Sequence, residues 1–290
     1  MLAPVAFVLA ALVAACGGSA AAPTTGGSSA PADLVAATPA ADADHIDHPT
    51  GPTDVVLRVA EEGGFMMMES VMARVPRFTL YGDGRVLISA PAEAAKAAPG
   101  NGLPAEVLRE THLTEDEVQA VLRSALVDGK VGIAKEEFPV MVMDVPTTVI
   151  ELQAGGVDKR IAVAGLGMEP PPGPDAAVLT ALAELVERLV AIPTDADYAA
   201  SASVAVLAPT EPAPGTATTA WPWPDTAPQA FDQPPPDDPF GFTTHLLTPA
   251  ESDAIKAAPG DAAGPFTFDG PDGKTYVVVV RPALPEEAAA

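Results

Sequence analysis

The sequence predicts an α+β fold, built from antiparallel β-hairpins with helices packed on one face and divided into two sub-units. Pairs of alternating apolar segments are joined by short glycine-containing turns, which is typical of hairpins. Other segments repeat apolar residues at helical spacing, and a proline-rich stretch over residues 209–239 interrupts the regular pattern. We therefore assign residues 53–200 to a main α+β domain, 201–285 to a smaller unit and 286–290 to a tail.

Strands are predicted where apolar residues alternate along the chain. The first covers Val55 to Ala60, another covers Val204 to Leu207, and three hairpins pair 77–81 with 85–89, 147–153 with 159–164, and 265–269 with 274–281. Gly82-Asp83-Gly84 joins the first pair, and glycine accepts the positive φ that a tight hairpin turn needs. Asp83 therefore has a structural role in the turn, and we do not assign it as a catalytic acid.

Helices are predicted from their N-terminal signals and their apolar faces. Residues 114–117 and 248–251 both read Thr-x-x-Glu, the capping-box pattern that begins a helix. The first of these helices ends before Gly129, because glycine is typical of a helix C-terminus. A longer apolar stripe predicts a helix from Asp175 that Pro193 ends. The sequence leaves open whether the two units share one sheet.

The single cysteine, Cys16, ends an apolar N-terminal segment and precedes Gly-Gly-Ser. This pattern is typical of a bacterial lipoprotein, so we expect a signal peptide at 1–15, a diacylglycerol on Cys16 and a lipidated disordered tether over 16–52. No Lys or Arg precedes Arg58, and either a start further upstream or a minimal signal would account for that. The alternative is a small hydrophobic N-terminus with a chance cysteine.

A lipid on Cys16 would determine where the protein is located and would exclude reactions that need a free thiol. The acylated chain has no free thiol, which excludes disulfides and cysteine catalysis. We expect an extracytoplasmic protein, lipid-anchored to the outer face of the cytoplasmic membrane, because two acyl chains anchor stably. The net charge of −24 argues against nucleic acid. The expected partners are the membrane, through the anchor on Cys16, and an envelope protein.

Candidate metal ligands crowd together at one place in the predicted tether. Asp42, Asp44, His45, Asp47 and His48 would suit loose binding of Zn²⁺ or Cu²⁺. A structural or catalytic zinc site needs ligands that are fixed by surrounding structure, which a tether does not supply. The alternative is an acidic, solvated linker with two incidental histidines, and we assign no metal site.

Catalytic motifs are missing from the sequence. It contains no nucleophile elbow, no His-Glu-x-x-His and no complete phosphate-binding loop. A hydrolase site assembled from distant residues would use His112 or His245 as its base. The alternative is that both are surface or cap-neighbouring histidines. We assign no catalytic residue and no cofactor.

Two apolar features bear on binding. The segment from Phe65 to Met68 is either a flexible hydrophobic surface, because thioether side chains repack against varied partners, or core filling under the first sheet. The segment Trp221-Pro-Trp223-Pro either docks on the protein's own sheet or is offered to a partner. We expect a non-enzymatic binding or interaction module of the cell envelope, with an envelope hydrolase or a weak metal-binding tether as alternatives.

Four segments carry a resemblance to a known group. They read VVLRVAEEGGF at Val55 to Phe65, FTLYGDGRV at Phe78 to Val86, WPWPD at Trp221 to Asp225 and KTYVVVVRPALP at Lys274 to Pro285. Together they resemble uncharacterised secreted lipoproteins of actinobacteria and related GC-rich Gram-positive bacteria. The resemblance implies the extracytoplasmic location and the two-part layout, and it implies no catalytic residue.

Overall fold

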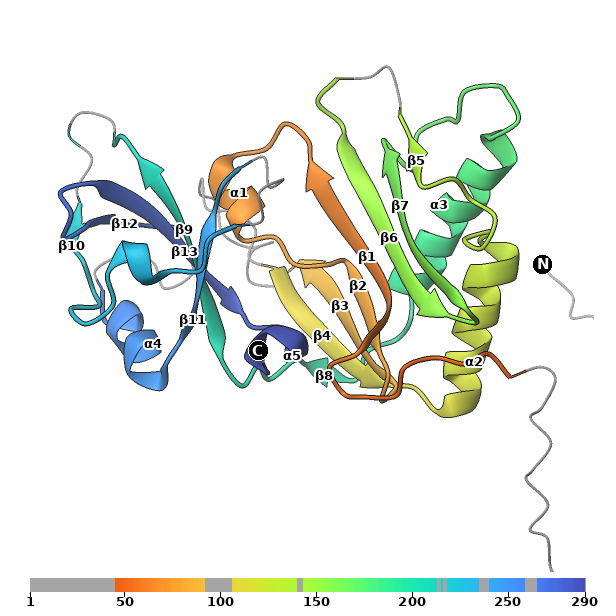
Figure 1. Ribbon diagram of the computed structural model, residues 1–290, viewed down its shortest axis with the longest axis horizontal. Helices are drawn as coiled ribbons and strands as arrows, with labels where there is room; N and C mark the ends of the chain where they lie inside the picture. Colours follow the sequence, from red (N-terminus) through yellow and green to blue (C-terminus); the bar gives the residue numbers. More distant parts are fainter. Residues whose placement is uncertain are drawn as a thin grey trace, which may run out of the picture. The chain divides into compact units, whose positions relative to one another are not determined.

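The computed structural model of the protein describes residues 45–91, 106–139, 143–212, 215, 218–234, 240–258 and 265–289 (Figure 1). These residues form an α+β fold of two mostly antiparallel sheets with helices packed against them, which confirms the predicted fold class. Within the described ranges the sheets have eight and five strands and share none. Both sheets belong to one compact unit that spans residues 43–290.

The larger sheet is centred on β1 (Val55–Gly63), which pairs antiparallel with both β2 (Phe78–Tyr81) and β6 (Pro146–Ala154). Its strand order is β5-β7-β6-β1-β2-β3-β4-β8, and the remaining strands are β3 (Arg85–Pro91), β4 (Glu106–His112), β5 (Glu137–Phe138), β7 (Val157–Ala164) and β8 (Ala196–Asp197). The two hairpins predicted for the main domain, β2–β3 and β6–β7, are confirmed and lie on either side of β1.

Two helices, α2 (Glu115–Arg123) and α3 (Ala176–Val190), pack on the larger sheet (Figure 1). The capping box before α2 is present, because the backbone N–H of Thr114 donates to the Glu117 carboxylate at 2.8 Å. The chain continues from α2 as one π-helical turn, Ser124–Asp128. The apolar faces of these helices complete the main core, to which they contribute Val118, Leu122, Ala125, Leu182, Leu185, Val186 and Leu189.

The smaller sheet has the order β10-β12-β13-β9-β11, formed by β9 (Ser203–Thr210), β10 (Thr219–Ala220), β11 (Thr243–Leu247), β12 (Phe266–Asp269) and β13 (Thr275–Pro282). The predicted hairpin β12–β13 and the capping box of α4 (Pro249–Lys256) are confirmed. Ile255 of α4 and Phe231, which follows the 3-10 turn Pro228–Ala230, lie in one apolar cluster of this sheet. α1 (Met68–Met72) and α5 (Pro285–Ala288) contribute to the other cluster.

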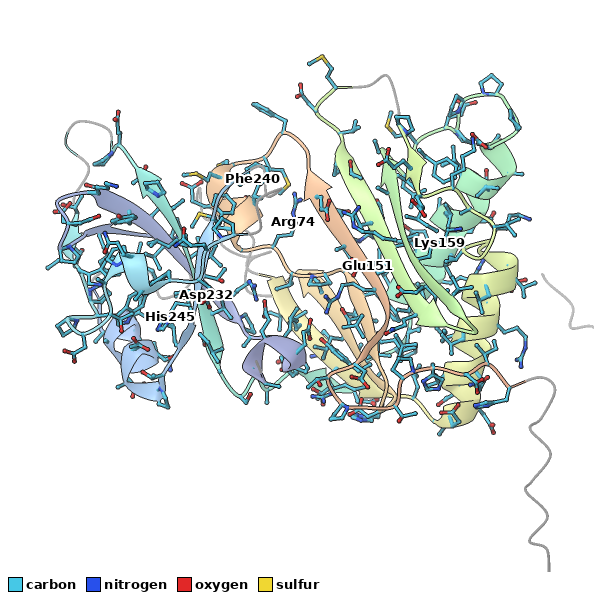
Figure 2. All side chains as sticks on the ribbon, in the orientation of Figure 1. Arg74, Glu151, Lys159, Asp232, Phe240 and His245 are labelled. Carbon is cyan, nitrogen blue, oxygen red and sulfur yellow. The ribbon has the colours of Figure 1, made fainter. Side chains whose placement is uncertain are left out.

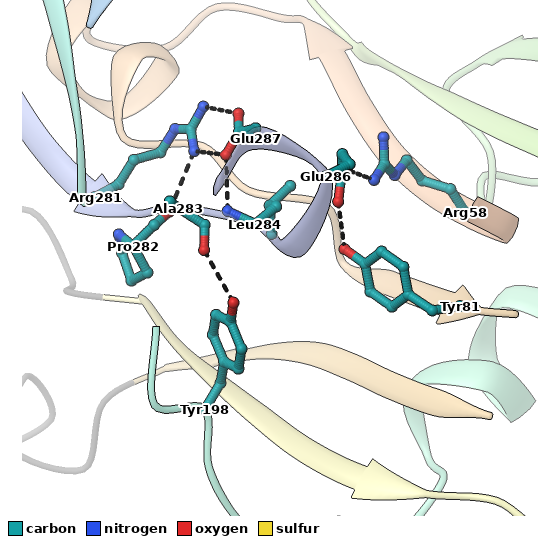
Figure 3. Close-up of polar contacts among 9 residues, drawn as sticks. All are labelled: Arg58, Tyr81, Tyr198, Arg281, Pro282, Ala283, Leu284, Glu286 and Glu287. Atoms are coloured by element: carbon teal, nitrogen blue, oxygen red, sulfur yellow. Dashed lines mark hydrogen bonds and ion pairs between the residues drawn. The ribbon is translucent and has the colours of Figure 1, made fainter. Parts of the chain in front are cut away.

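The two sheets are joined by polar contacts at α5 (Figure 3). The Glu286 carboxylate forms an ion pair with Arg58 of β1 and accepts a hydrogen bond from the Tyr81 hydroxyl at 2.8 Å. Tyr198 donates its hydroxyl to the backbone carbonyl of Ala283 at 3.1 Å. We call Arg58, Tyr81 and Glu286 the clasp. The tail predicted at 286–290 therefore contains the end of α5, which contacts both sheets.

The described chain begins before the predicted end of the tether at residue 52. The backbone N–H and carbonyl of Ile46 both hydrogen-bond to the side chain of Gln119 on α2, at 2.8 and 2.9 Å. The carbonyl of Asp47 accepts from Gly155 N–H, in the β6–β7 turn, at 2.7 Å. The partly buried Ile46 side chain packs against the main core. These contacts fix the chain from His45 onward, and Cys16 lies outside the described residues.

Candidate interaction surface

The end of β1 turns the chain out of the larger sheet through two adjacent glycines. Gly63 and Gly64 have φ values of +61° and +83°, which glycine adopts without strain. A Cβ on Gly64 would also lie 3.2 Å from the backbone of Pro146. The glycine pair therefore lets the chain leave the sheet before Phe65, because Gly63 is the last paired residue of β1.

Hydrogen bonds hold the start of the segment that follows, Phe65 to Met68. The N–H of Phe65 donates to the carbonyl of Asp144 at 3.1 Å. The guanidinium of Arg74, which is labelled in Figure 2, donates to the carbonyls of Glu61 at 2.9 Å and Gly63 at 3.2 Å. It also contacts the sulfur of Met66. The segment is thus held near its start by backbone hydrogen bonds.

The side chains of this segment nevertheless face solvent. Phe65 is 88% exposed, and Met66, Met67 and Met68 are all among the exposed large apolar residues. Met72, one helical turn further, is only 2% exposed and lies in the apolar cluster of β9 and β13. The chain is therefore fixed before and after the exposed row. Of the two interpretations of Phe65 to Met68, exposure at the surface is confirmed.

Two further exposed methionines lie at the same end of the larger sheet. Gly63 pairs with Pro146, and Thr147 pairs with Ala164, so the end of β1, the start of β6 and the end of β7 are adjacent. Met143 precedes this start of β6, and Met168 follows this end of β7. We call the exposed side chains that share this end the methionine edge: Phe65, Met66, Met67, Met68, Met143 and Met168.

A cavity of about 630 Å³ adjoins the methionine edge at Met168. It is lined by the end of β7, the loop 165–171 and one side of α3, where Leu179 and Ala183 lie. Glu169 and Glu184 are the charged residues of this lining. The apolar surface therefore extends from the methionine edge toward α3 as a recess with carboxylates beside it.

The tryptophan segment docks on its own sheet. Trp223 is 2% exposed and lies in the core of the smaller sheet, where its indole N–H donates to the carbonyl of Glu251 at 3.0 Å. The indole of Trp221 donates to the carbonyl of Thr226 at 2.7 Å, and the two tryptophan rings meet edge to face at 5.2 Å. Of the two interpretations of this segment, docking within the protein is confirmed.

The two candidate catalytic histidines lie far apart in the topology. His112, at the end of β4, is largely exposed, and its Nε2 is 3.9 Å from the Asp83 carboxylate. His245, on β11 of the other sheet, lies 3.2 Å from both carboxylate oxygens of Glu251. Neither histidine lines the cavity beside α3. The contacts of His245 belong to the capping box of α4, which is a structural role.

Glu251 is the centre of that capping box. Partial burial disfavours its charged form, but hydrogen bonds from Thr226, from the backbone and hydroxyl of Thr248 and from His245 outweigh burial and lower the pKa of Glu251 to about 2. The charged carboxylate therefore stabilises the fold, since it accepts hydrogen bonds from three different segments of the chain.

We expect Glu251→Gln to lower the free energy of unfolding by about 1 kcal/mol at pH 7, as loss of a helix cap does. Because the folded pKa of Glu251 lies below its usual value of 4.5, this stabilisation is present above pH 4.5 and is lost as the pH falls toward 2. Urea denaturation between pH 7 and pH 3 should show that the difference in the free energy of unfolding between the variant and the parent becomes smaller as the pH falls. Glu117→Gln, in the exposed capping box of α2, is the matched control. Hydrogen bonds from Thr114 lower the pKa of Glu117 as well, but Glu251 also accepts from Thr226 and His245, so the pH dependence of the control should have the same sign and be smaller. An equal pH dependence of the two variants would contradict the prediction.

Of the candidate metal ligands in the predicted tether, His45, Asp47 and His48 lie within the described chain. The His48 side chain is 3% exposed, its Nδ1 lies 2.6 Å from the carbonyl of Pro49, and its Nε2 lies 3.3 Å from the Glu115 carboxylate. Among described residues, no three His, Cys, Asp or Glu side chains are grouped to hold a metal ion. Asp42 and Asp44 lie outside those residues. His48 therefore serves to fix the chain against α2.

Comparisons with protein-family models, with curated proteins and with solved structures give no match to this chain. In the part of the chain that the structure describes, none of the helices combines the length and the apolar character needed to cross a membrane.

Proposed function

We propose that this protein is a membrane-anchored lipoprotein on the outer face of the cytoplasmic membrane and acts as a non-enzymatic interaction module of the cell envelope. The methionine edge is its contact surface. The observation that carries the proposal is the exposure of Phe65 to Met68 between fixed neighbours. Contiguous exposed apolar side chains mark interaction sites, and methionines adapt to the shape of a partner.

The direction of β1 supports this use of the methionine edge. The chain enters the larger sheet at Val55, beside the β6–β7 turn that contacts Asp47. It reaches the methionine edge only after Gly63, at the other end of a nine-residue strand of about 30 Å. The described chain thus enters the larger sheet at the end opposite the methionine edge.

The anchor is tested by Cys16→Ser. We expect this variant to leave the membrane fraction, because the serine hydroxyl does not take the thioether-linked diacylglycerol and the apolar segment alone is too short to span a bilayer. Fractionation of cells followed by detection of the protein measures the change. Tight membrane retention of Cys16→Ser, at the parental level, would contradict the lipoprotein assignment.

The contact surface is tested by crosslinking in intact membranes. A photoreactive residue in place of Met67 should capture an envelope protein, and Phe65→Ser with Met68→Gln in the same chain should remove most of the captured product. A photoreactive residue at Ile133, which is also strongly exposed, is the matched control and should capture little. Equal capture at both positions, or capture that is unchanged by the substitutions, would contradict the proposed function.

A further inference from the structure

We propose that the partner of the methionine edge is a basic, amphipathic helical segment of an envelope protein. This inference rests on the proposed function and adds the chemistry of the partner. It depends on three properties of the surface: its apolar side chains, the recess beside it and the sign of the surrounding charge.

The side chains of the methionine edge suit the apolar face of a helix. Such a face presents anchors at spacings of three or four residues, and a groove lined by flexible apolar side chains receives them. Met66, Met67 and Met68 are unbranched thioethers that adjust to varied anchors. The recess of about 630 Å³ beside Met168 offers room for large apolar side chains at the end of the same surface.

Carboxylates border this surface, and the nearby cation Arg74 already has partners. Glu69 lies on α1 directly after Met68, and Asp144 follows Met143, while Glu169 and Glu184 line the recess. The guanidinium of Arg74 is occupied by the backbone carbonyls at the end of β1. A partner with basic residues flanking its apolar face would meet complementary charge at these carboxylates.

The same charges disfavour the other occupants of an apolar surface. A second copy of the chain would bring carboxylates against carboxylates, and each chain carries a net charge of −24. An anionic bilayer surface would repel the protein for the same reason. Apolar contact with opposite charge around it therefore favours a basic segment over self-association or insertion into lipid.

The experiment measures binding of synthetic helical peptides to the full chain held in phosphatidylcholine nanodiscs. The probe is a leucine–lysine peptide with one apolar stripe. A peptide of the same composition without the stripe and a leucine–glutamate peptide with the stripe are the controls. Fluorescence anisotropy should show that the parent binds the striped basic peptide about tenfold or more tightly than either control.

Two sets of variants connect binding to the surface. Met66→Gln, Met67→Gln and Met68→Gln together should weaken binding of the striped basic peptide about tenfold, whereas Val127→Gln with Ile133→Gln, also at exposed apolar positions, should not change it. Glu69→Gln with Asp144→Asn should weaken binding severalfold and reduce its salt dependence. Urea denaturation of each variant confirms that it folds.

Several results would overturn the inference. Equal binding of the peptide without the stripe would show unspecific attraction to an acidic protein. Binding of phosphatidylglycerol vesicles, or self-association in sedimentation, that disappears in the methionine variant would identify lipid or a second copy as the occupant. If crosslinking at Met67 captures a partner whose contacting segment is not basic, the inference fails and the proposed function stands. If crosslinking captures nothing specific, the proposed function fails as well.

Discussion

Replacing Trp223 with alanine should lower the free energy of unfolding by about 3–5 kcal/mol, because truncating a buried aromatic side chain leaves a cavity. Trp223 lies with Phe231 and Phe268 in the core of the smaller sheet. The substitution also removes the indole donor that satisfies the carbonyl of Glu251, which adds the cost of an unmade hydrogen bond. Urea denaturation followed by circular dichroism measures the loss.

Phe65→Ala is the matched control for Trp223→Ala, since it removes another aromatic side chain from a strongly exposed position. We expect it to change the free energy of unfolding by no more than about 0.5 kcal/mol, as exposed substitutions usually do. Comparable losses in the two variants would mean that Phe65 packs in the folded protein. A small loss for Trp223→Ala would contradict its place in the core.

The elements that the sequence predicts are those with local signals. Gly82-Asp83-Gly84 defines a turn within three residues, and both capping boxes need only a threonine and a glutamate three positions apart. The structure has each of these elements where the sequence predicts it, because the interactions that favour them lie within a few residues. The turn between β6 and β7 also has a local signal, since the adjacent glycines Gly155 and Gly156 favour a turn there.

The elements that the sequence does not predict depend on distant partners. β4 carries the polar run Arg109-Glu110-Thr111 and forms a strand because it pairs with β3 along its whole length. β11 reads Thr-Thr-His-Leu-Leu, without clear alternation, and is held at the edge of its sheet by β9. The pairing of β1 with both hairpins is likewise set by tertiary contacts, which no local pattern records.

The candidate surface likewise combines a local signal with contacts between residues that are distant in the sequence. The composition of Phe65 to Met68 is compatible with a core and with a surface, and long-range contacts decide between them. One local signal was available, since Gly63-Gly64 directly before Phe65 indicates a turn out of the strand. The hydrogen bonds from Arg74 and to Asp144, which fix the exposed segment, join residues that the sequence does not connect.

The second large effect should come from the clasp, where Glu286→Ala should lower the free energy of unfolding by about 2–3 kcal/mol. The change leaves the partly buried guanidinium of Arg58 and the hydroxyl of Tyr81 without their acceptor (Figure 3). Burial and the charge of Glu286 raise the pKa of Tyr81 well above its usual value, so that hydroxyl stays protonated and needs an acceptor at any ordinary pH.

Two spectroscopic signals can show whether the clasp couples the sheets. The chain has two tryptophans, Trp221 and Trp223, and both lie in the apolar cluster of the smaller sheet. Tryptophan fluorescence therefore reports the smaller sheet, whereas far-ultraviolet circular dichroism reports both sheets. We expect one shared urea transition for the parent and two separated transitions for Glu286→Ala, with the fluorescence change at the lower urea concentration.

Two further variants distinguish the clasp from an ordinary surface ion pair. Glu62→Ala removes one of the carboxylates that pair with Arg160 at an exposed position and should cost no more than about 1 kcal/mol. Arg58→Met with Glu286→Leu replaces both charges by apolar side chains and should recover the part of the loss that comes from Arg58, because no buried charge is then left without a partner. The part that comes from the Tyr81 hydroxyl should remain, since leucine offers no acceptor. If Glu286→Ala costs no more than Glu62→Ala and its two transitions coincide, the contact between the sheets does not depend on this carboxylate.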